Sequence, residues 1–333
     1  MRSFIRMLIS VPLLAVCGAV QATALLTIGP DDPGALFPVP RELTALSTAG
    51  VASPVATLSD GSQAFNGGLA YRPSGSGGAE HLYAIANDSL GQSTLYRLDV
   101  DGGNLTAILS LGVGFTGGLA YDPGLDALYA IQTDLFSTQP GSSLFRVDLT
   151  SGPTLTALGA LTGIYGGGFG GGLTLNVSDG MLYGTAWDDV GNPRRLNAIN
   201  RSSASDTTVF DLGDGDLAFN GGLAYDPVSD AFFAIANDFA ANSTLMTFLL
   251  SGAGTLSAVG ASFGQGFLNA GLAFAPEVTP PPPPTVSEPS TLALMLLAAV
   301  LGPATARLNK REVAKRRLVL TVSLSMVPTR ASA

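Results

Sequence analysis

One aspartate recurs at the same offset after an apolar run in five successive segments of the chain. These aspartates are Asp31, Asp88, Asp134, Asp188 and Asp238. A second polar position precedes a different apolar run and holds Asn66, Thr116, Asn220 and Asn269, with Gly170 in the middle copy. Oxygen groups that converge on one ring are ligands that Ca²⁺ prefers. The alternative is that each aspartate accepts hydrogen bonds from its own loop, and the repetition favours this alternative because every copy has such a loop.

A second set of residues departs from this pattern. Trp187 stands where the other copies have Asn or Thr, and Asp188, Asp189, Arg194 and Arg195 follow it. An exposed tryptophan can stack on a sugar ring while neighbouring Asp and Arg side chains bond its hydroxyls. The alternative is that Trp187 covers the edge of a neighbouring unit of the fold, as aromatic side chains commonly do.

The single histidine, His81, gives little support for catalysis. Its equivalents in the other copies are Ala24, Ala127, Met181 and Ala231, and no nucleophile can be paired with it from the sequence. We therefore predict no catalytic residue. One histidine and one cysteine, Cys17, cannot supply the usual ligands of zinc. The glycine-rich run at 166–172 precedes a predicted strand and lacks a following lysine, so it does not match a phosphate-binding loop.

A repeat of some fifty residues must position these side chains. The stretch GGLAYDP at 117–123 returns unchanged at 221–227, and it returns at 67–73 with Arg72 in place of the aspartate. Weaker copies begin at Gly171 and Ala270. The leucines of this stretch stand at 69, 119, 173, 223 and 272, so the spacings are 50, 54, 50 and 49. A fixed period of this size indicates a repeat architecture.

Each copy contains four short apolar runs separated by turn residues, which predicts four strands. Four strands in such a period predict one blade of a β-propeller. The N-terminal part supplies a second, third and fourth strand at Leu25–Ile28, Ala35–Val39 and Val55–Leu58, and the C-terminal part supplies a first strand at Gly271–Phe274. The sequence therefore predicts an all-β, five-bladed propeller over residues 25–277, closed by strands from both termini.

The succession of a Gly-hydrophobic-Ala-hydrophobic-Asp-Pro strand and a Leu-Tyr-Ala strand resembles the NHL and YVTN type of β-propeller repeat. This resemblance extends over the propeller region. It implies the fold and says little about activity, because propellers host many functions.

Composition and charge agree with a folded, acidic domain. Hydrophobic residues make up 46% of the chain and charged residues 12%, which argues against disorder. Between Leu25 and Thr279 there are 23 acidic residues and 7 arginines, a net charge of −16. Such a body repels phosphate backbones, so we expect no nucleic-acid partner.

Residues 1–24 are typical of a secretory signal peptide. Arg2 and Arg6 precede the apolar run Met7–Val20, and small residues near Ala22 and Ala24 offer cleavage sites. The apolar run is short for a membrane helix. A lipoprotein signal that ends at Cys17 fits less well, because Val16 stands where a small residue is expected.

The composition changes after the propeller. Residues 278–290 form a proline-rich spacer, 291–306 an apolar helix, and 307–333 a basic tail with an extension. An apolar helix that ends in basic residues predicts stop-transfer, with the basic end in the cytoplasm.

The order of Glu288-Pro289-Ser290, the apolar helix and the basic cluster at 307–317 resembles the PEP-CTERM sorting signal. In that family the signal directs exported proteins of Gram-negative, exopolysaccharide-producing bacteria to an exosortase, which processes the tail. This chain departs from the pattern at Ser287, where the family usually has proline, and in the extension after Arg317. The resemblance implies an envelope or extracellular protein, transiently anchored in the inner membrane, with an exosortase-type enzyme as a partner.

Two classes of function remain open from the sequence. The favoured hypothesis is a non-enzymatic surface or matrix propeller with a structural or binding role, whose partners are exopolysaccharide or other surface proteins. The alternative is a calcium-dependent hydrolase or lyase that works at the mouth of the central channel. A tightly held divalent metal would favour the enzyme.

Overall fold

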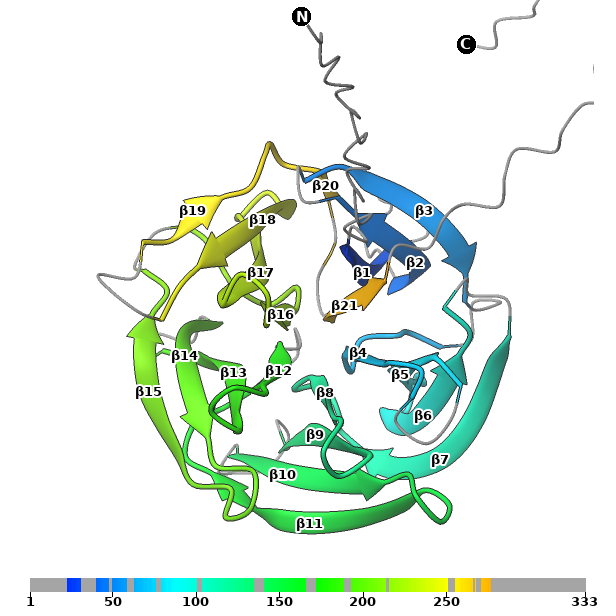
Figure 1. Cartoon of the computed structure of the whole chain (residues 1–333). Coiled ribbons are helices and arrows are strands. Elements are labelled where there is room, and N and C mark those ends of the chain that lie inside the picture. The colour runs from blue at the N-terminus through cyan, green and yellow to red at the C-terminus, as the bar shows by residue number, and fades with distance from the viewer. Residues whose placement is uncertain are drawn as a thin grey trace, which may run out of the picture. The chain divides into compact units, whose positions relative to one another are not determined.

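The computed structural model shows a ring of five four-stranded blades around a central axis (Figure 1). It describes residues 23–30, 40–47, 50–58, 63–75, 79–100, 104–134, 141–165, 172–188, 193–213, 216–250, 255–265, 267 and 271–276. All of these belong to one compact unit, 1–278, and a second unit, 279–333, lies outside the described residues.

Four blades are consecutive antiparallel meanders, with the first strand nearest the axis and the last outermost. Blade 2 contains β4 (Leu69–Arg72), β5 (His81–Asn87), β6 (Gln92–Leu98) and β7 (Leu105–Val113). Blade 3 contains β8 (Leu119–Asp122), β9 (Ala127–Asp134), β10 (Gly141–Asp148) and β11 (Thr154–Leu161). Blade 4 contains β12 (Leu173–Asn176), β13 (Met181–Trp187), β14 (Pro193–Ile199) and β15 (Asp206–Asp211). Blade 5 contains β16 (Leu223–Asp226), β17 (Ala231–Asn237), β18 (Asn242–Phe248) and β19 (Ser257–Ala258).

Blade 1 joins the two ends of the propeller, which confirms the predicted closure. Its strand order is β21 (Leu272–Pro276), β1 (Thr23–Pro30), β2 (Pro40–Leu46) and β3 (Ala52–Thr57). β21 pairs with β1 from Thr23↔Pro276 to Thr27↔Leu272. The Thr27 hydroxyl also donates a hydrogen bond to the Gly271 carbonyl at 2.7 Å. Because β21 lies between β1 and the axis, the ring has no open inner edge at this blade.

The prediction for the third strand of blade 1 was wrong. That strand is Pro40–Leu46, and it pairs with β1, whereas the sequence predicted Ala35–Val39. The prediction assumed the same number of residues between the second and third strands in every blade. In blade 1 these strands are separated by residues 31–39, whereas in blade 2 they are separated only by residues 88–91. Pro38 within the predicted strand also lacks the N–H that a strand paired on both sides needs.

The outer edge of blade 5 is not the single fourth strand that the repeat predicts for each copy. The run at 256–260 contributes only the two-residue strand β19, and a second short strand, β20 (Gly264–Gln265), pairs with the same neighbour, β18. The outer strand of this blade is therefore divided into two pieces.

The hydrophobic core lies between the blades. One apolar cluster fills each of the five boundaries between neighbouring blades. An aromatic side chain that precedes each first strand is buried at these boundaries, with at most 7% of its surface exposed: Phe65, Phe115, Tyr165, Phe219 and Phe267. Burial of these large side chains, together with the leucines and alanines of each cluster, holds neighbouring blades together.

A buried polar network adds to the boundary between blades 3 and 4. The Tyr165 hydroxyl donates to Asp206 Oδ2 and accepts from Asn197 Nδ2 at 2.8 Å. Asp206 Oδ1 accepts from both the backbone N–H and the hydroxyl of Thr162. Burial and the neighbouring Asp206 raise the pKa of Tyr165. The network gives the buried Tyr165 hydroxyl and the Asp206 carboxylate hydrogen-bond partners, while Thr162 lies at its exposed end.

Within the described part of the chain, no helix is long and apolar enough to cross a membrane. The predicted signal peptide, spacer, apolar helix and sorting motif Glu288-Pro289-Ser290 lie outside the described residues, apart from Thr23 and Ala24 in β1.

Deletion of residues 267–276 tests the closure. The deletion removes β21 and Phe267 and leaves β1 with an exposed edge, so we expect a loss of stability well beyond the roughly 1 kcal/mol of a typical point change. Thermal unfolding of the full chain followed by circular dichroism measures it. A deletion of equal length at 318–327 is the control and should leave the melting temperature unchanged. Equal melting of both variants would contradict the closure.

Candidate functional site

The recurring polar residues lie on one face of the propeller. In each blade, the loop between second and third strands and the connection into the first strand emerge on the same side, which we call the upper face. Asp88, Asp188 and Asp238 belong to such loops, and Asp134 ends β9. The opposite side, formed by the loops between first and second strands, is the lower face. Asp31, Asn269 and Gly170 lie outside the described residues.

Two of the aspartates cap their own loops. Asp88 Oδ1 accepts the backbone N–H groups of Leu90 and Gln92 at 2.8 and 2.9 Å. Asp238 Oδ1 accepts those of Ala240 and Asn242 at 2.9 and 2.8 Å. Hydrogen bonds from the Asn242 side chain and backbone lower the pKa of Asp238. These contacts are those of the loop-capping hypothesis.

The structure describes further members of the expected ring on the same face. Asp134 is exposed at the end of its strand, and Asp188 lies 3.9 Å from Arg194. The side-chain oxygens of Asn66 and Asn220 accept hydrogen bonds from Asn87 and Asn237. Among the described residues, no three carboxylate, imidazole or thiol side chains gather closely enough to hold a metal ion. The calcium hypothesis stays a prediction.

A buried Asn–Ser pair links blade 2 to blade 3, and sequence reasoning missed it. Ser93 Oγ donates to Asn87 Oδ1 and accepts the Phe115 N–H at 3.0 Å. Blade 5 repeats the pattern: Ser243 Oγ donates to Asn237 and accepts the Phe267 N–H at 3.2 Å. The signal was present, because Asn precedes the loop aspartate and Ser is the second residue of the third strand in both blades. These pairs fix the chain where it enters each following blade.

A groove of about 610 Å³ opens on the upper face between blades 2 and 3. Its lining brings together four residues that the sequence singled out, Asn66, Asp88, Thr116 and Asp134. The other lining residues are Asn87, Ser89, Leu90, Gly91, Val113, Gly114, Gln132 and Thr133. Gln132 is held in place by its Nε2, which donates to the Val113 carbonyl at 2.8 Å. No basic side chain is among the lining residues, so the groove combines polar and apolar surface and its only charged groups are the carboxylates of Asp88 and Asp134.

The second predicted cluster, around Trp187, is largely buried. Arg194 is only 8% exposed, and its Nε donates to the Leu217 carbonyl at 2.9 Å. Trp187 is half-buried, and its Nε1 is buried with no hydrogen-bond partner in the described part of the chain. Arg195 is half-buried in β14, and Asp189 lies outside the described residues. Arg194 therefore acts as a link within the fold rather than as an exposed ligand for sugar hydroxyls.

The central channel contains a small cavity. A cavity of about 110 Å³ is lined by residues of the five first strands, among them Leu69, Leu119, Leu173, Ala224 and Leu272. Tyr71, Tyr121 and Tyr225 are the lining residues that carry a titratable group, and no carboxylate belongs to this lining.

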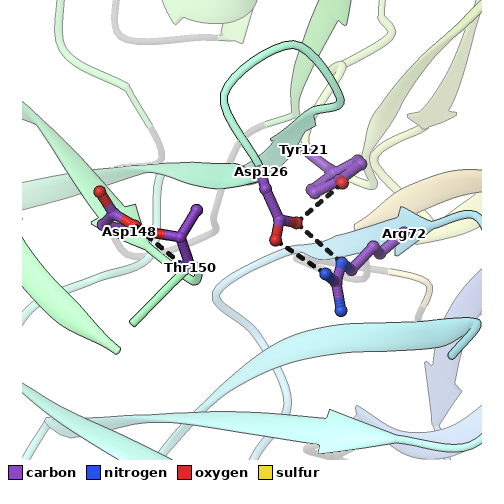
Figure 2. A network of polar contacts seen from close by, with 5 residues as sticks. All are labelled: Arg72, Tyr121, Asp126, Asp148 and Thr150. Carbon is purple, nitrogen blue, oxygen red and sulfur yellow. Dashed lines mark hydrogen bonds and ion pairs between the residues drawn. The ribbon is translucent and has the colours of Figure 1, made fainter. Parts of the chain in front are cut away.

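On the lower face, two ion pairs of opposite polarity join neighbouring blades. Figure 2 shows the ion pair between Arg72 of blade 2 and Asp126 of blade 3. Arg72 Nε donates to Asp126 Oδ1 at 2.8 Å, and Nη2 donates to Oδ2 at 2.7 Å. Tyr121 donates to the same carboxylate at 3.0 Å. Between blades 3 and 4 the polarity is reversed, since Asp122 accepts from Arg201. Arg72 and Asp122 occupy the same place in the repeat, so the repeat tolerates either sign there.

His81 lies near this ion pair, at the start of β5. Its Nδ1 is 3.8 Å from Asp99 Oδ1, too far for a hydrogen bond. Burial and the nearby Arg97 lower the pKa of His81, so the ring is neutral at pH 7. No serine, threonine or cysteine of the described chain is hydrogen-bonded to it, and the structure brings no nucleophile to it.

A scan against models of known protein families finds no match, and a search of curated proteins finds none either. Solved structures with a similar arrangement include a nidogen/laminin complex, with a TM-score of 0.46 and 14% identity over 73% of this chain and 80% of that chain. They also include a six-bladed Aleuria aurantia lectin, with a TM-score of 0.48 and 9% identity over 73% of this chain and 82% of the lectin chain. A Xanthomonas campestris gluconolactonase has TM-score 0.44, 13% identity and coverage of 77% and 88%. Likenesses at this level carry no argument about what this chain does.

Substitution of Asp88 tests the loop caps. Asp88→Ala removes the acceptor of two loop N–H groups and should cost about 1 kcal/mol, by analogy with other side-chain caps. Asp88→Asn keeps an oxygen acceptor and should cost less. Denaturant unfolding of both variants measures the difference.

A chelator separates this result from the calcium hypothesis. If the aspartates act only as caps, addition of EDTA to the wild-type protein should leave its melting temperature unchanged. A drop of many degrees would contradict the cap interpretation and support a bound cation.

Proposed function

We propose that this chain is an exported β-propeller that binds a neutral, hydroxyl-rich polymer, of the exopolysaccharide class, through the upper-face groove between blades 2 and 3. The observation that carries the proposal is the lining of that groove. It presents amide, hydroxyl and carboxylate groups over a volume of about 610 Å³. Ligand pockets typically have volumes of about 300–1,000 Å³ with a few placed polar groups, so this groove is large enough for sugar units.

The groups in the groove match sugar hydroxyls in kind. A hydroxyl both donates and accepts, and side-chain amides such as those of Asn66 and Gln132 offer both functions in one group. Asp88 uses Oδ1 for its loop, and its Oδ2 makes no hydrogen bond to any described residue. Leu90, which is 79% exposed, and Val113 add apolar surface against which the C–H face of a sugar can pack.

The charge of the groove argues for an uncharged ligand. Two carboxylates, Asp88 and Asp134, line it without any basic residue, and the propeller region has a net charge of −16. An anionic polymer would meet repulsion both locally and at long range.

A glycan-binding measurement tests this role. The full-length protein should bind members of an array of neutral oligosaccharides. Ser89→Trp places a bulky side chain in the groove and should weaken that binding at least tenfold. Ala240→Trp, in the corresponding loop of blade 5, is outside the groove lining and should leave binding unchanged. Failure to bind any neutral glycan, or equal loss in both variants, would reject the proposal.

We further propose that the signal peptide is removed after Ala22. Thr23 and Ala24 are already paired in β1, opposite Pro276 and Ala275, so cleavage after Ala24 would shorten the strand that closes the ring. At the other end, an exosortase-type enzyme would cut near Glu288-Pro289 and release the propeller from the apolar helix at 291–306. The support for this is the sequence resemblance described above.

Detection of the two ends separately tests this route. An antibody against the propeller should find it at the cell surface or in the medium, with Thr23 as its first residue by N-terminal sequencing. A tag placed after Ala333 should stay with the cell, because the basic cluster stops transfer. If propeller and tag appear together in the medium on one chain, the sorting proposal is wrong.

A further inference from the structure

A second pocket, of about 280 Å³, lies at the lower face between blades 2 and 3. Arg72, Tyr83, Arg97, Ile108, Leu149 and Pro153 line it. The first four come from the strands of blade 2, and the last two come from the connection between β10 and β11. This connection also carries Asp148 and Thr150, drawn in Figure 2, whose side chains bond each other. The pocket is thus built from two blades and contains two of the seven arginines of the propeller region.

The charge of Arg72 is already paired within the pocket wall. Its guanidinium makes the two bonds to Asp126 described above, and the two side chains are only 11% and 17% exposed. This bidentate pair fixes the position of Arg72 and neutralises it locally. A ligand that enters the pocket therefore meets an ordered wall at this side rather than a second free charge.

Arg97 supplies the unpaired charge. Its side chain makes no hydrogen bond or ion pair with any described residue, and it is exposed. It lies in the middle of the sheet, opposite Tyr83 on β5 and Thr106 on β7, so its backbone is held on both sides. An arginine presents five N–H donors in a planar fork that matches a carboxylate.

We propose that this pocket binds a small organic acid whose single carboxylate pairs with Arg97 and whose ring-sized body packs against Ile108, Leu149 and Pro153. One unpaired guanidinium balances one negative charge. The pocket volume is at the lower end of the range for ligand sites, which favours a single ring over a polymer. The proposal is independent of the upper-face groove, which lies on the opposite face.

The neighbouring acidic groups favour a monoanion over a phosphate. Asp126 is held by Arg72, and Asp99 accepts a hydrogen bond from Asn104 and lies close to His81. The Asp99 carboxylate would repel the second charge of a phosphate, which Arg97 alone cannot balance. The site therefore selects by total charge as well as by shape.

Blade 3 provides a matched control within the same chain. Arg146 stands opposite Tyr129 as Arg97 stands opposite Tyr83. At that boundary, however, Asp122 occupies the place of Arg72 and accepts from Arg201 of blade 4. Arg146 thus shares the repeat position of Arg97 without belonging to the lining of the pocket.

The experiment titrates D-glucuronate into the full-length protein at low salt and follows it by isothermal calorimetry. The wild-type protein should bind it saturably, and D-glucose, which lacks the carboxylate, should show no binding that Arg97→Ala removes. Arg97→Ala should weaken binding at least tenfold, and Arg97→Lys should retain part of it because the charge remains without the fork. Arg146→Ala should bind as the wild type does. Ser89→Trp, in the upper groove, should also have no effect.

Four outcomes would overturn the proposal: no binding to the wild-type protein, unchanged binding by Arg97→Ala, equal loss in Arg146→Ala, or inorganic phosphate bound as tightly as glucuronate. Circular dichroism melts of all variants check folding. Because Arg97 is exposed and has no partner to lose, its replacement should leave the melting temperature within a degree or two of wild type.

Discussion

The close approach of the first strands around the channel is the constraint on which the rest of the propeller depends. A Cβ atom on Gly68 would lie 2.4 Å from the backbone nitrogen of Leu119 in the next blade. A Cβ atom on Gly271 would lie 2.3 Å from the backbone nitrogen of Leu69, and this contact between blades 1 and 2 closes the ring. Both glycines also have positive φ, +111° and +65°, where a side chain is strained. Only glycine permits backbone to meet backbone here.

This contact explains why the core lies between blades. When the first strands touch at the axis, the flat faces of neighbouring sheets are brought together, and the space between them must be filled. Phe65 and Phe115 fill two of these spaces, and the buried Asn–Ser pair beside Phe115 satisfies the backbone of the connection. A blade therefore cannot bury its own faces alone, and a missing strand anywhere in the ring exposes two boundaries.

The repeated parts of the fold could be predicted from sequence because each copy faces the same constraint. The glycine pair, the short first strand and the loop aspartate recur for that reason, and the closure by β1 and β21 followed from counting them. The third strand of blade 1 could not be predicted in the same way, since the connection before Pro40 has its own length. A constant period says nothing about insertions between strands.

The candidate sites were only partly predictable, and the reason is physical. Asn66, Asp88 and Asp134 were found from their recurrence, but the groove that unites them depends on how two blades meet. Contacts such as Arg72 with Asp126 and Tyr165 with Asp206 join residues far apart in sequence, and these contacts are not repeated in the other copies. A periodic pattern cannot indicate which non-repeated residues meet across a boundary.

Departures from the repeat are therefore where one boundary becomes different from the next. At the lower face, the exchange of aspartate for arginine at position 72 keeps an ion pair between blades but reverses its direction. At the boundary between blades 3 and 4 the carboxylate belongs to the first of the two blades, whereas between blades 2 and 3 it belongs to the second. Arg97 therefore lies beside the paired Arg72 and not beside an aspartate at that position. A single substitution in an otherwise constant scaffold thus changes the electrostatic character of one pocket while the backbone contact at the axis, set by glycine, stays as it is in the other blades.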